Sequence, residues 1–190
     1  DSASRGLGDV YKRQHHNRRD KKNDKNNDGF LDKPLQDQNN FLNKWQYTDA
    51  LNGIVGFFNI RYLDDEKIFG MNNNESRNVW NGEISTKRFD SSFKLGYVNP
   101  NLPFQSLGVQ LAYSSHDQNS LYGFRNYDIN QNSFFSNVVY NSIITNTQNK
   151  IKFGLNYTSD VYDEILNRQD IGRKDNSFGG FFEYSFDNFN

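Results

Sequence analysis

Lys150-Ile151-Lys152-Phe153-Gly154-Leu155-Asn156-Tyr157 decides the fold class of this chain. Apolar residues occupy every odd position, and polar residues or glycine occupy every even one. Side chains of a β-strand point alternately to opposite faces, so this period of two predicts a strand with one apolar face and one polar face. We expect Ile151, Phe153, Leu155 and Tyr157 to share the apolar face.

The same alternation recurs through most of the chain after Asn39, and no stretch of it shows sustained helical spacing. Examples are the sets Leu107, Val109, Leu111 and Tyr113, and Phe93, Leu95 and Tyr97, each of which alternates with polar or small residues. The sequence therefore predicts an all-β fold of about seven strands. Their predicted ranges are 39–48, 53–66, 82–98, 105–117, 131–145, 149–165 and 176–187.

The connections between these strands are predicted to alternate in length. Three are short, namely Asp49–Asn52, Asn99–Phe104 and Asn146–Gln148, and three are longer and more polar, namely Lys67–Asn81, Gln118–Asn130 and Asn167–Asp175. An antiparallel up-and-down meander with tight turns at one end and long loops at the other is typical of outer-membrane β-barrels. The apolar faces are rich in Phe and Tyr, and the opposite faces are rich in Gly, Ser, Asn, Gln and Lys. This division favours a partial transmembrane barrel. A soluble all-β domain is the alternative.

Composition excludes several other classes of protein. The chain has 190 residues, 22 basic and 23 acidic, so no basic footprint points to nucleic acid as a partner. It has no cysteine, which rules out disulfides, thiolate zinc sites and a cysteine nucleophile. No serine-nucleophile elbow, zinc-protease motif or phosphate-binding glycine loop is present, so we expect that the chain is not an enzyme.

The residues before the alternating segments differ from them in composition. Residues 1–14 (DSASRGLGDVYKRQ) resemble the translated read-through of a sequencing adapter, a resemblance carried by GDVYKRQ. They are predicted to be a non-natural extension. Residues 15–38 are polar and charged and are predicted to form an outer loop, followed by the partial barrel over 39–190. The acidic residues Asp64, Asp65, Glu66, Asp163 and Glu164 are interpreted as solvated charges at the barrel rim.

One segment of that loop carries a metal-binding pattern. Residues 24–32 (DKNNDGFLD) match D-x-[DN]-x-[DN]-G, the first half of a calcium-binding loop. The predicted ligands are the side chains of Asp24, Asn26, Asp28 and Asp32 and the carbonyl of Phe30, which suit a cation that takes six to eight oxygens. Position twelve is Leu35 rather than an acid, so the EF-hand loop is incomplete. The alternative is a turn rich in Asn, Asp and Gly whose acids are solvated.

Several phrases also resemble a known family. They are DKNNDGFLD, FLNKWQYTD and SFKLGYVNPNLPFQSLGVQLAYSSHDQNSLYGFRNYD, and together they resemble the barrel region of TonB-dependent outer-membrane receptors of Bacteroidetes-type bacteria. The resemblance runs from about Asn23 to the C-terminus.

This resemblance implies a fragment, roughly a third, of a barrel of about twenty-two strands in the cell outer membrane. Such transporters take up a scarce substrate such as an iron chelate, cobalamin or a glycan. The implied partners are outer-membrane lipid, that small-molecule or glycan substrate, and the TonB complex, which acts through a plug domain absent from this chain. The alternative function is a secreted, calcium-stabilised β domain that binds carbohydrate or protein.

Overall fold

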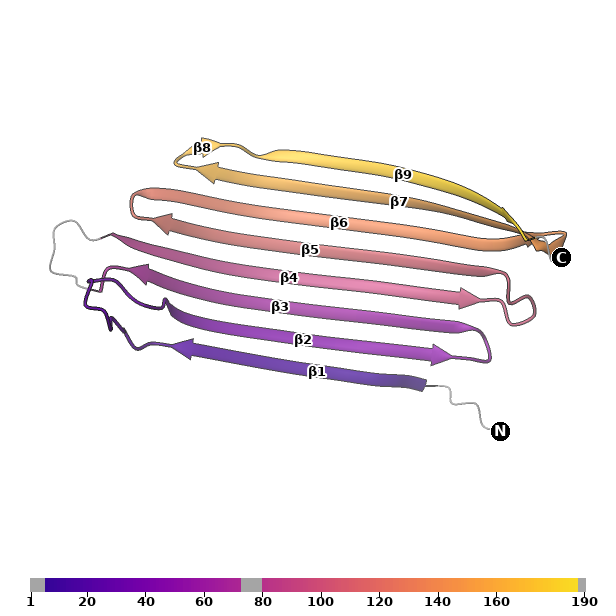
Figure 1. The fold of residues 1–190 in the computed structure, drawn as a ribbon, viewed down its shortest axis with the longest axis horizontal. Helices are drawn as coiled ribbons and strands as arrows, with labels where there is room; N and C mark the ends of the chain where they lie inside the picture. The colour runs from indigo at the N-terminus through magenta and orange to yellow at the C-terminus, as the bar shows by residue number, and fades with distance from the viewer. Residues whose placement is uncertain (1–5, 73–79, 188–190) are drawn as a thin grey trace.

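The computed structural model describes residues 6–72 and 80–187, and all of its regular structure is antiparallel β-sheet. The strands are β1 (Gly6–Arg19), β2 (Leu35–Asp49), β3 (Ile54–Gly70), β4 (Asn81–Val98), β5 (Ser106–Tyr122), β6 (Arg125–Ile144), β7 (Asn146–Leu166), β8 (Gln169–Asp170) and β9 (Arg173–Phe186). They form one curved layer in which each strand follows its predecessor, except that β8 and β9 both pair with β7 (Figure 1). The predicted all-β antiparallel meander is confirmed.

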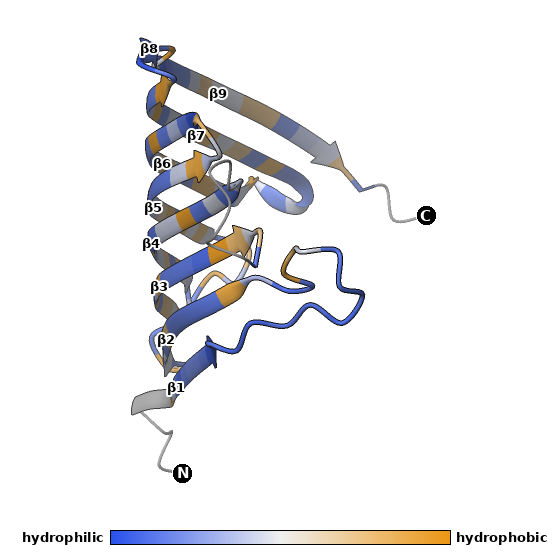
Figure 2. Cartoon of the chain, turned by 90° about the vertical axis from the view of Figure 1, so that its left-hand side faces the viewer, coloured by the Kyte–Doolittle hydropathy of each residue, from blue (hydrophilic) through white to orange (hydrophobic). Residues whose placement is uncertain are grey.

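The sheet is open. Within the described chain, β1 pairs only with β2 and β9 pairs only with β7, so the two edges do not meet (Figures 1 and 2). The seven predicted strands correspond to β2–β7 and β9, and the structure adds β1 and the two-residue β8. None of the described residues belongs to a helix long and apolar enough to cross a bilayer.

The strands are long and their connections gather at the two ends of the sheet. β3 has 17 residues, which is about 55 Å of extended chain at ~3.3 Å per residue. The turns 50–53 and 99–105 and the single residue Thr145 lie at one end, here called the turn end. The connections 20–34, 123–124 and 167–168 lie at the other, the loop end, on the left of Figure 1, where β3 ends and β4 begins.

At the turn end the predicted connections Asp49–Asn52 and Asn99–Phe104 are confirmed to within a residue, but Asn146–Gln148 belong to β7 and the connection there is Thr145 alone. At the loop end the predictions are partly wrong. Residues 118–130 were expected to form a long loop, but β5 and β6 run through them and turn within Gly123–Phe124. Gly123 has φ +63°, the left-handed conformation that tight hairpins require. Likewise β9 begins at Arg173, inside the predicted connection 167–175.

The N-terminal segment contains more strand than the sequence predicted. Residues 6–19 form β1, which pairs along its length with β2, and β2 begins at Leu35. The predicted loop 15–38 is therefore confined to 20–34. It contacts the end of β3, because Leu31 N–H donates to the Gly70 carbonyl at 2.8 Å and Asn72 N–H donates to the Gly29 carbonyl at 2.7 Å.

No hydrophobic residue of the described chain is buried. A single layer has nothing packed against either of its faces, so the apolar side chains stay open on one side. For example, Phe93 is 37% exposed and Leu111 is 38% exposed. The structure thus leaves a wide apolar surface uncovered, and the two faces are the features on which function depends.

Candidate functional site

The strand register sorts the residues of the sheet into two faces, because directly paired residues lie on the same side. On the face here called the aromatic face, Trp45 pairs with Phe58, Phe58 with Phe93, and Phe93 with Leu111. Ile151, Phe153, Leu155 and Tyr157 lie on this face too, as predicted, through pairs such as Tyr140–Phe153. Lys150, Lys152 and Asn156 lie on the opposite, polar face.

Apolar residues on the aromatic face form a continuous band over the half of the sheet nearest the turn end. On β3 the band runs from Ile54 to Tyr62, and on β4 from Phe89 to Tyr97. Eight residue steps cover about 27 Å along the strand, at ~3.4 Å per step. At the strand tilt of ~35–45° found in membrane barrels this becomes about 19–22 Å, to which the terminal rings add. The apolar band of such barrels is roughly 25 Å tall.

Both margins of the band carry aromatic residues. The margin facing the loop end consists of Phe41, Tyr62, Phe89, Tyr113, Phe134, Tyr157 and Phe178. Neighbours in this row touch, with ring centroids 6.4 Å apart for Phe89–Tyr113 and for Phe134–Tyr157. The hydroxyl of Tyr113 donates to Asn132 Oδ1 at 2.9 Å and that of Tyr157 to Asn176 Oδ1 at 3.2 Å, so both turn away from the band.

The turn-end margin contains Tyr47, Tyr97, Tyr140, Tyr184 and Phe186. Aromatic rows at both margins are typical of a membrane barrel and not of a soluble domain, since the ring of tyrosine is apolar while its hydroxyl needs water. Aromatic residues also occur within the band, notably Trp45, which stacks on Phe58 with centroids 5.2 Å apart.

Beyond the band, toward the loop end, the same face becomes polar. It carries Asp37, Asn39, Asp64, Glu66, Glu83, Lys87, Asp117, Asn119, Asp128, Asn130 and Asp163. The polarity of the aromatic face therefore changes at the row of rings.

Two acids interpreted as solvated rim charges are instead buried, which corrects that interpretation. Asp65 is 6% exposed and Glu164 is 7% exposed, and both lie on the polar face near the loop end. Asp65 accepts a hydrogen bond from Gln36 Nε2 at 2.8 Å and pairs with Lys67 Nζ at 2.6 Å, while Glu164 pairs with Arg173 at 2.9 Å. Neighbouring long side chains on the sheet cover these carboxylates and neutralise them.

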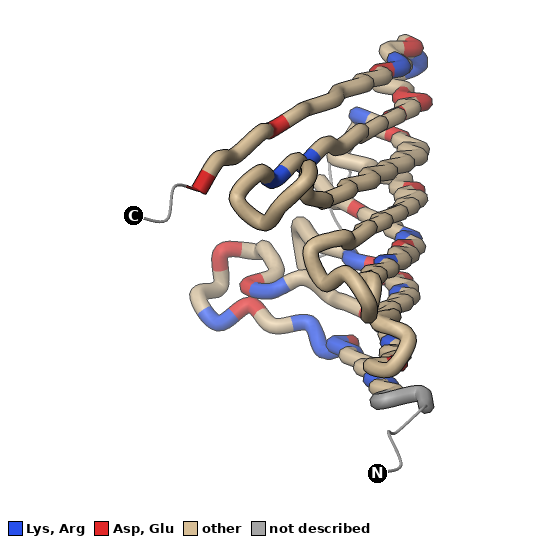
Figure 3. The backbone as a smooth tube through the Cα atoms, turned by 90° about the vertical axis from the view of Figure 1, so that its right-hand side faces the viewer, with Lys and Arg blue, Asp and Glu red and all other residues tan. Residues whose placement is uncertain are grey.

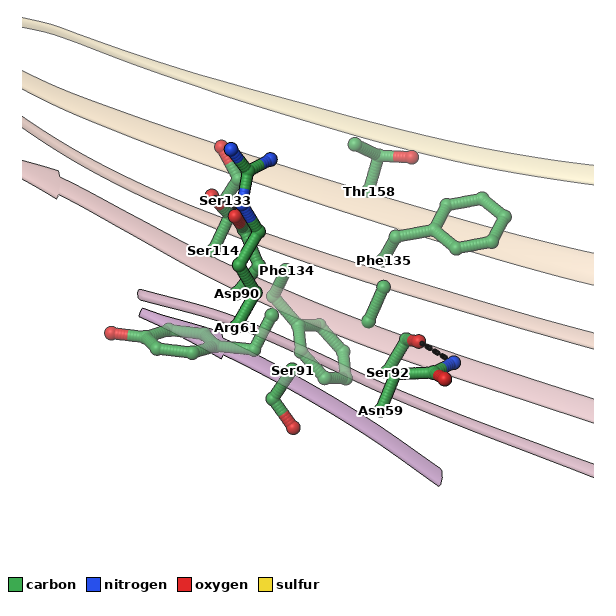
Figure 4. Close-up of a pocket in the computed structure, with 12 residues that line it drawn as sticks. Asn59, Arg61, Asp90, Ser91, Ser92, Ser114, Ser133, Phe134, Phe135 and Thr158 are labelled. Atoms are coloured by element: carbon green, nitrogen blue, oxygen red, sulfur yellow. Dashed lines mark hydrogen bonds between the residues drawn. The ribbon is translucent and has the colours of Figure 1, made fainter. Parts of the chain in front are cut away.

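The polar face holds a shallow cavity of about 230 Å³ at the height of the loop-end aromatic row (Figure 4). Asp90, one of its lining residues, accepts a hydrogen bond from Arg88, with Nη2 2.9 Å from Oδ1. Ser114 Oγ donates to the same carboxylate at 2.8 Å. Asn59 Nδ2 donates to Ser92 Oγ at 3.0 Å, the dashed line of Figure 4.

Two larger cavities, of about 450 and 420 Å³, lie beside this one across β1–β4 and share Lys44, Asn59 and Arg61 with their neighbours. Tyr11 of β1 lines the first of them, and Arg13 and His15 of β1 line the second. No motif in the sequence marks these residues. Lys44 and Lys94 occupy polar positions in the alternation of their strands. Only the register shows that they lie near each other on one face of the sheet.

The predicted calcium ligands lie in the 20–34 connection, which projects from the sheet with its basic and acidic residues interspersed (Figure 3). Asp24 accepts the N–H groups of Asp28 and Gly29 at 3.1 and 3.0 Å, and Asp28 accepts that of Phe30 at 2.8 Å. Asp32 Oδ2 accepts Lys25 N–H at 3.0 Å. Gly29, with φ +84°, makes the predicted sharp turn.

These contacts curl the loop around Asp24, while Asn26 Nδ2 donates to Asp28 at 2.8 Å. Across residues 6–72 and 80–187, no three His, Cys, Asp or Glu side chains form a group that could hold a metal ion. The carboxylates of the loop bind its own backbone rather than converge on one point. The calcium site therefore stays a prediction.

No protein-family model, curated protein or solved structure matches this chain.

Proposed function

We propose that this chain is part of the wall of an outer-membrane β-barrel transporter of the TonB-dependent type, which takes up a scarce substrate. The observation that carries the proposal is the apolar band bounded by aromatic rows on one face of a long-stranded meander. In a bilayer, β-strands must satisfy every backbone group by pairing, and their lipid-facing side chains must be apolar over the hydrocarbon thickness. The polar face would then line the aqueous lumen.

The absence of buried hydrophobic residues in the described chain supports this proposal over a soluble sheet domain. A soluble sheet hides its apolar face against a second layer, whereas here that face is open across every strand from β2 to β7. The substrate class, an iron chelate, cobalamin or a glycan, and coupling to the TonB complex come from the family resemblance alone.

The alternative, a secreted β domain stabilised by calcium, is favoured by one observation, the turn of the 24–32 loop around Asp24. Calcium bound there is compatible with both functions, because the loop end of a barrel of this type faces the outside of the cell. The exposed band favours the transporter.

The two tryptophans allow a direct test. Trp45 lies inside the band, while Trp80 lies at the loop end, where its ring is 5.9 Å from that of Phe69. Single-tryptophan variants, Trp80→Phe and Trp45→Phe, are refolded with vesicles of phosphatidylcholine that carry bromine on the acyl chains. Bromine should quench Trp45 strongly and Trp80 little. Equal quenching of both, or a monodisperse soluble monomer without detergent, would contradict the proposal.

A further inference from the structure

Three cations from three neighbouring strands gather on the polar face. Lys44 of β2 pairs with Asn59 of β3, and Arg61 lies two residues from Asn59 on one side. On the other side lies Phe57, which pairs with Lys94 of β4. With strands ~4.8 Å apart and ~3.4 Å per residue, the Cα atom of Lys44 is about 8 Å from that of Arg61 and about 12 Å from that of Lys94.

Among the described residues, the two lysines lack acidic partners, whereas Arg61 attracts the nearby carboxylate of Asp90. All three are exposed, and in the described part of the chain neither lysine has a carboxylate oxygen within 4.0 Å. The nearest acid on this face, Asp90, pairs with Arg61 in register but is held by Arg88 and Ser114. Like charges concentrated on one surface repel each other and create a positive potential that attracts anions.

A cavity on the polar face lies beside these cations. The exposed ring of Phe57, 38% accessible, lies between Lys94 and Gln46, and the cavity there of about 450 Å³ is also lined by Lys44 and Asn59. Asn59, which already donates to Ser92, has a carbonyl and a second N–H group still available. The surface thus offers spaced cations around an apolar patch with hydrogen-bonding groups.

We infer that Lys44, Arg61 and Lys94 form a binding site for a small polyanion, a compound carrying two or more carboxylate or phosphate groups about 8–12 Å apart or closer on an apolar frame. None of the three belongs to the extension 1–14. Charge-assisted hydrogen bonds from lysine and arginine are the strong ones, and Phe57 supplies apolar contact. That such an anion is the transported substrate rests on the proposed function, whereas the site itself does not.

The test is calorimetric titration of the full chain, refolded in an uncharged maltoside detergent, with citrate and with inorganic pyrophosphate as probes. The two probes distinguish carboxylate from phosphate preference. Replacing Lys44 and Lys94 together by glutamine should weaken binding of the preferred probe about tenfold or more, since each lost charge-assisted hydrogen bond is worth roughly that factor. The control replaces Lys87 and Lys174, two lysines of the aromatic face, by glutamine and should change affinity less than about twofold.

A second measurement needs no variant. Lysine acetylation followed by mass spectrometry should show Lys44 and Lys94 protected by the probe, and Lys87 and Lys174 modified equally with and without it. Failure of both probes to bind, or equal loss in the two double variants, would overturn the site. Binding without bromine quenching of Trp45 would overturn only the transporter proposal, and quenching without binding would overturn only this inference.

Discussion

The two halves of each long strand differ in the polarity of the side chains on their two faces. Near the turn end, the aromatic face carries mainly apolar and small residues around Phe58, Phe93 and Leu111, with Asn43 as a polar exception, while the polar face carries lysines and amides. Near the loop end, both faces are polar, with Asp64 and Asp117 on one and Gln118 and Thr86 on the other. Backbone pairing continues without change across the boundary. The boundary is therefore a change in the polarity of the side chains and not the end of a strand.

The largest expected effect comes from introducing a charge on each side of this boundary, on one face of one strand. Leu111 lies in the row with Phe58 and Phe93, near the middle of the band, and Asn119 lies eight residues beyond Leu111 on the same face. Leu111→Arg should reduce the free energy of unfolding in phosphatidylcholine vesicles by about 2–4 kcal/mol, the cost of a charge near the bilayer midplane. Urea titration followed by tryptophan fluorescence measures it.

Asn119→Arg is the matched control and should change the same free energy by less than about 0.5 kcal/mol, because that position meets water. Equal costs at the two positions would remove the distinction between the halves.

A smaller effect is expected on the polar face of the band half, where packing rather than lipid sets the cost. The ring of Phe181 lies over Gly154, and a Cβ atom there would come within 2.4 Å of Phe181 Cε1. Gly154→Ala should displace the ring and reduce stability by about 1–3 kcal/mol, as overpacking does. The control is Gly108→Ala, where the nearest atom would be Val139 O at 3.9 Å. A loss of stability in the control as large as that in Gly154→Ala would show that loss of the glycine, not the ring, is responsible.

The weakest effect is expected at the loop end, in the 24–32 loop. If calcium binds, Asp28→Ala should abolish calcium-dependent protection of Lys25 from trypsin, because Asp28 is a central ligand in the predicted set. With Leu35 in place of the twelfth-position acid, affinity should be roughly 10⁻⁴–10⁻³ M. Asp37→Ala, on β2, should leave protection unchanged. Identical cleavage of the unmodified chain in calcium and in chelator would retire the site.

The difference between the turn-end and loop-end halves of the strands also explains which parts of the fold could be predicted. Alternation located the strands wherever one face is apolar, as in 149–165, and placed Phe153 and Lys152 on opposite faces. It failed over 118–130, because Asn119, Asp128 and Asn130 face one side and Gln118 and Gln131 the other, so no period of two is visible. Pairing there depends on backbone hydrogen bonds and on the Gly123–Phe124 turn. β1 was not predicted because residues 1–14 were interpreted as a non-natural extension and residues 15–19 are all polar.

The two candidate sites also differ in how far they could be predicted from the sequence. A local motif such as 24–32 can be found from spacing alone, and its turn at Gly29 was predicted correctly. The cluster of Lys44, Arg61 and Lys94 could not be, since its members lie far apart in the chain and depend on how three strands are aligned. A one-residue slip in that alignment would move a lysine to the other face.

The meander has a consequence for how the chain reaches its structure. Every strand from β2 to β7 pairs with its immediate chain neighbours, so each hairpin joins residues that are close in sequence. Short loops cost little entropy to close, and a sheet of this kind can grow one hairpin at a time from whichever hairpin forms first. The two-residue link Gly123–Phe124 has an outward phenylalanine, 97% exposed, that a protease such as chymotrypsin could cut. Cleavage there would turn the joining of β5 and β6 from a local event into an encounter between two separate chains, which would then depend on their concentration.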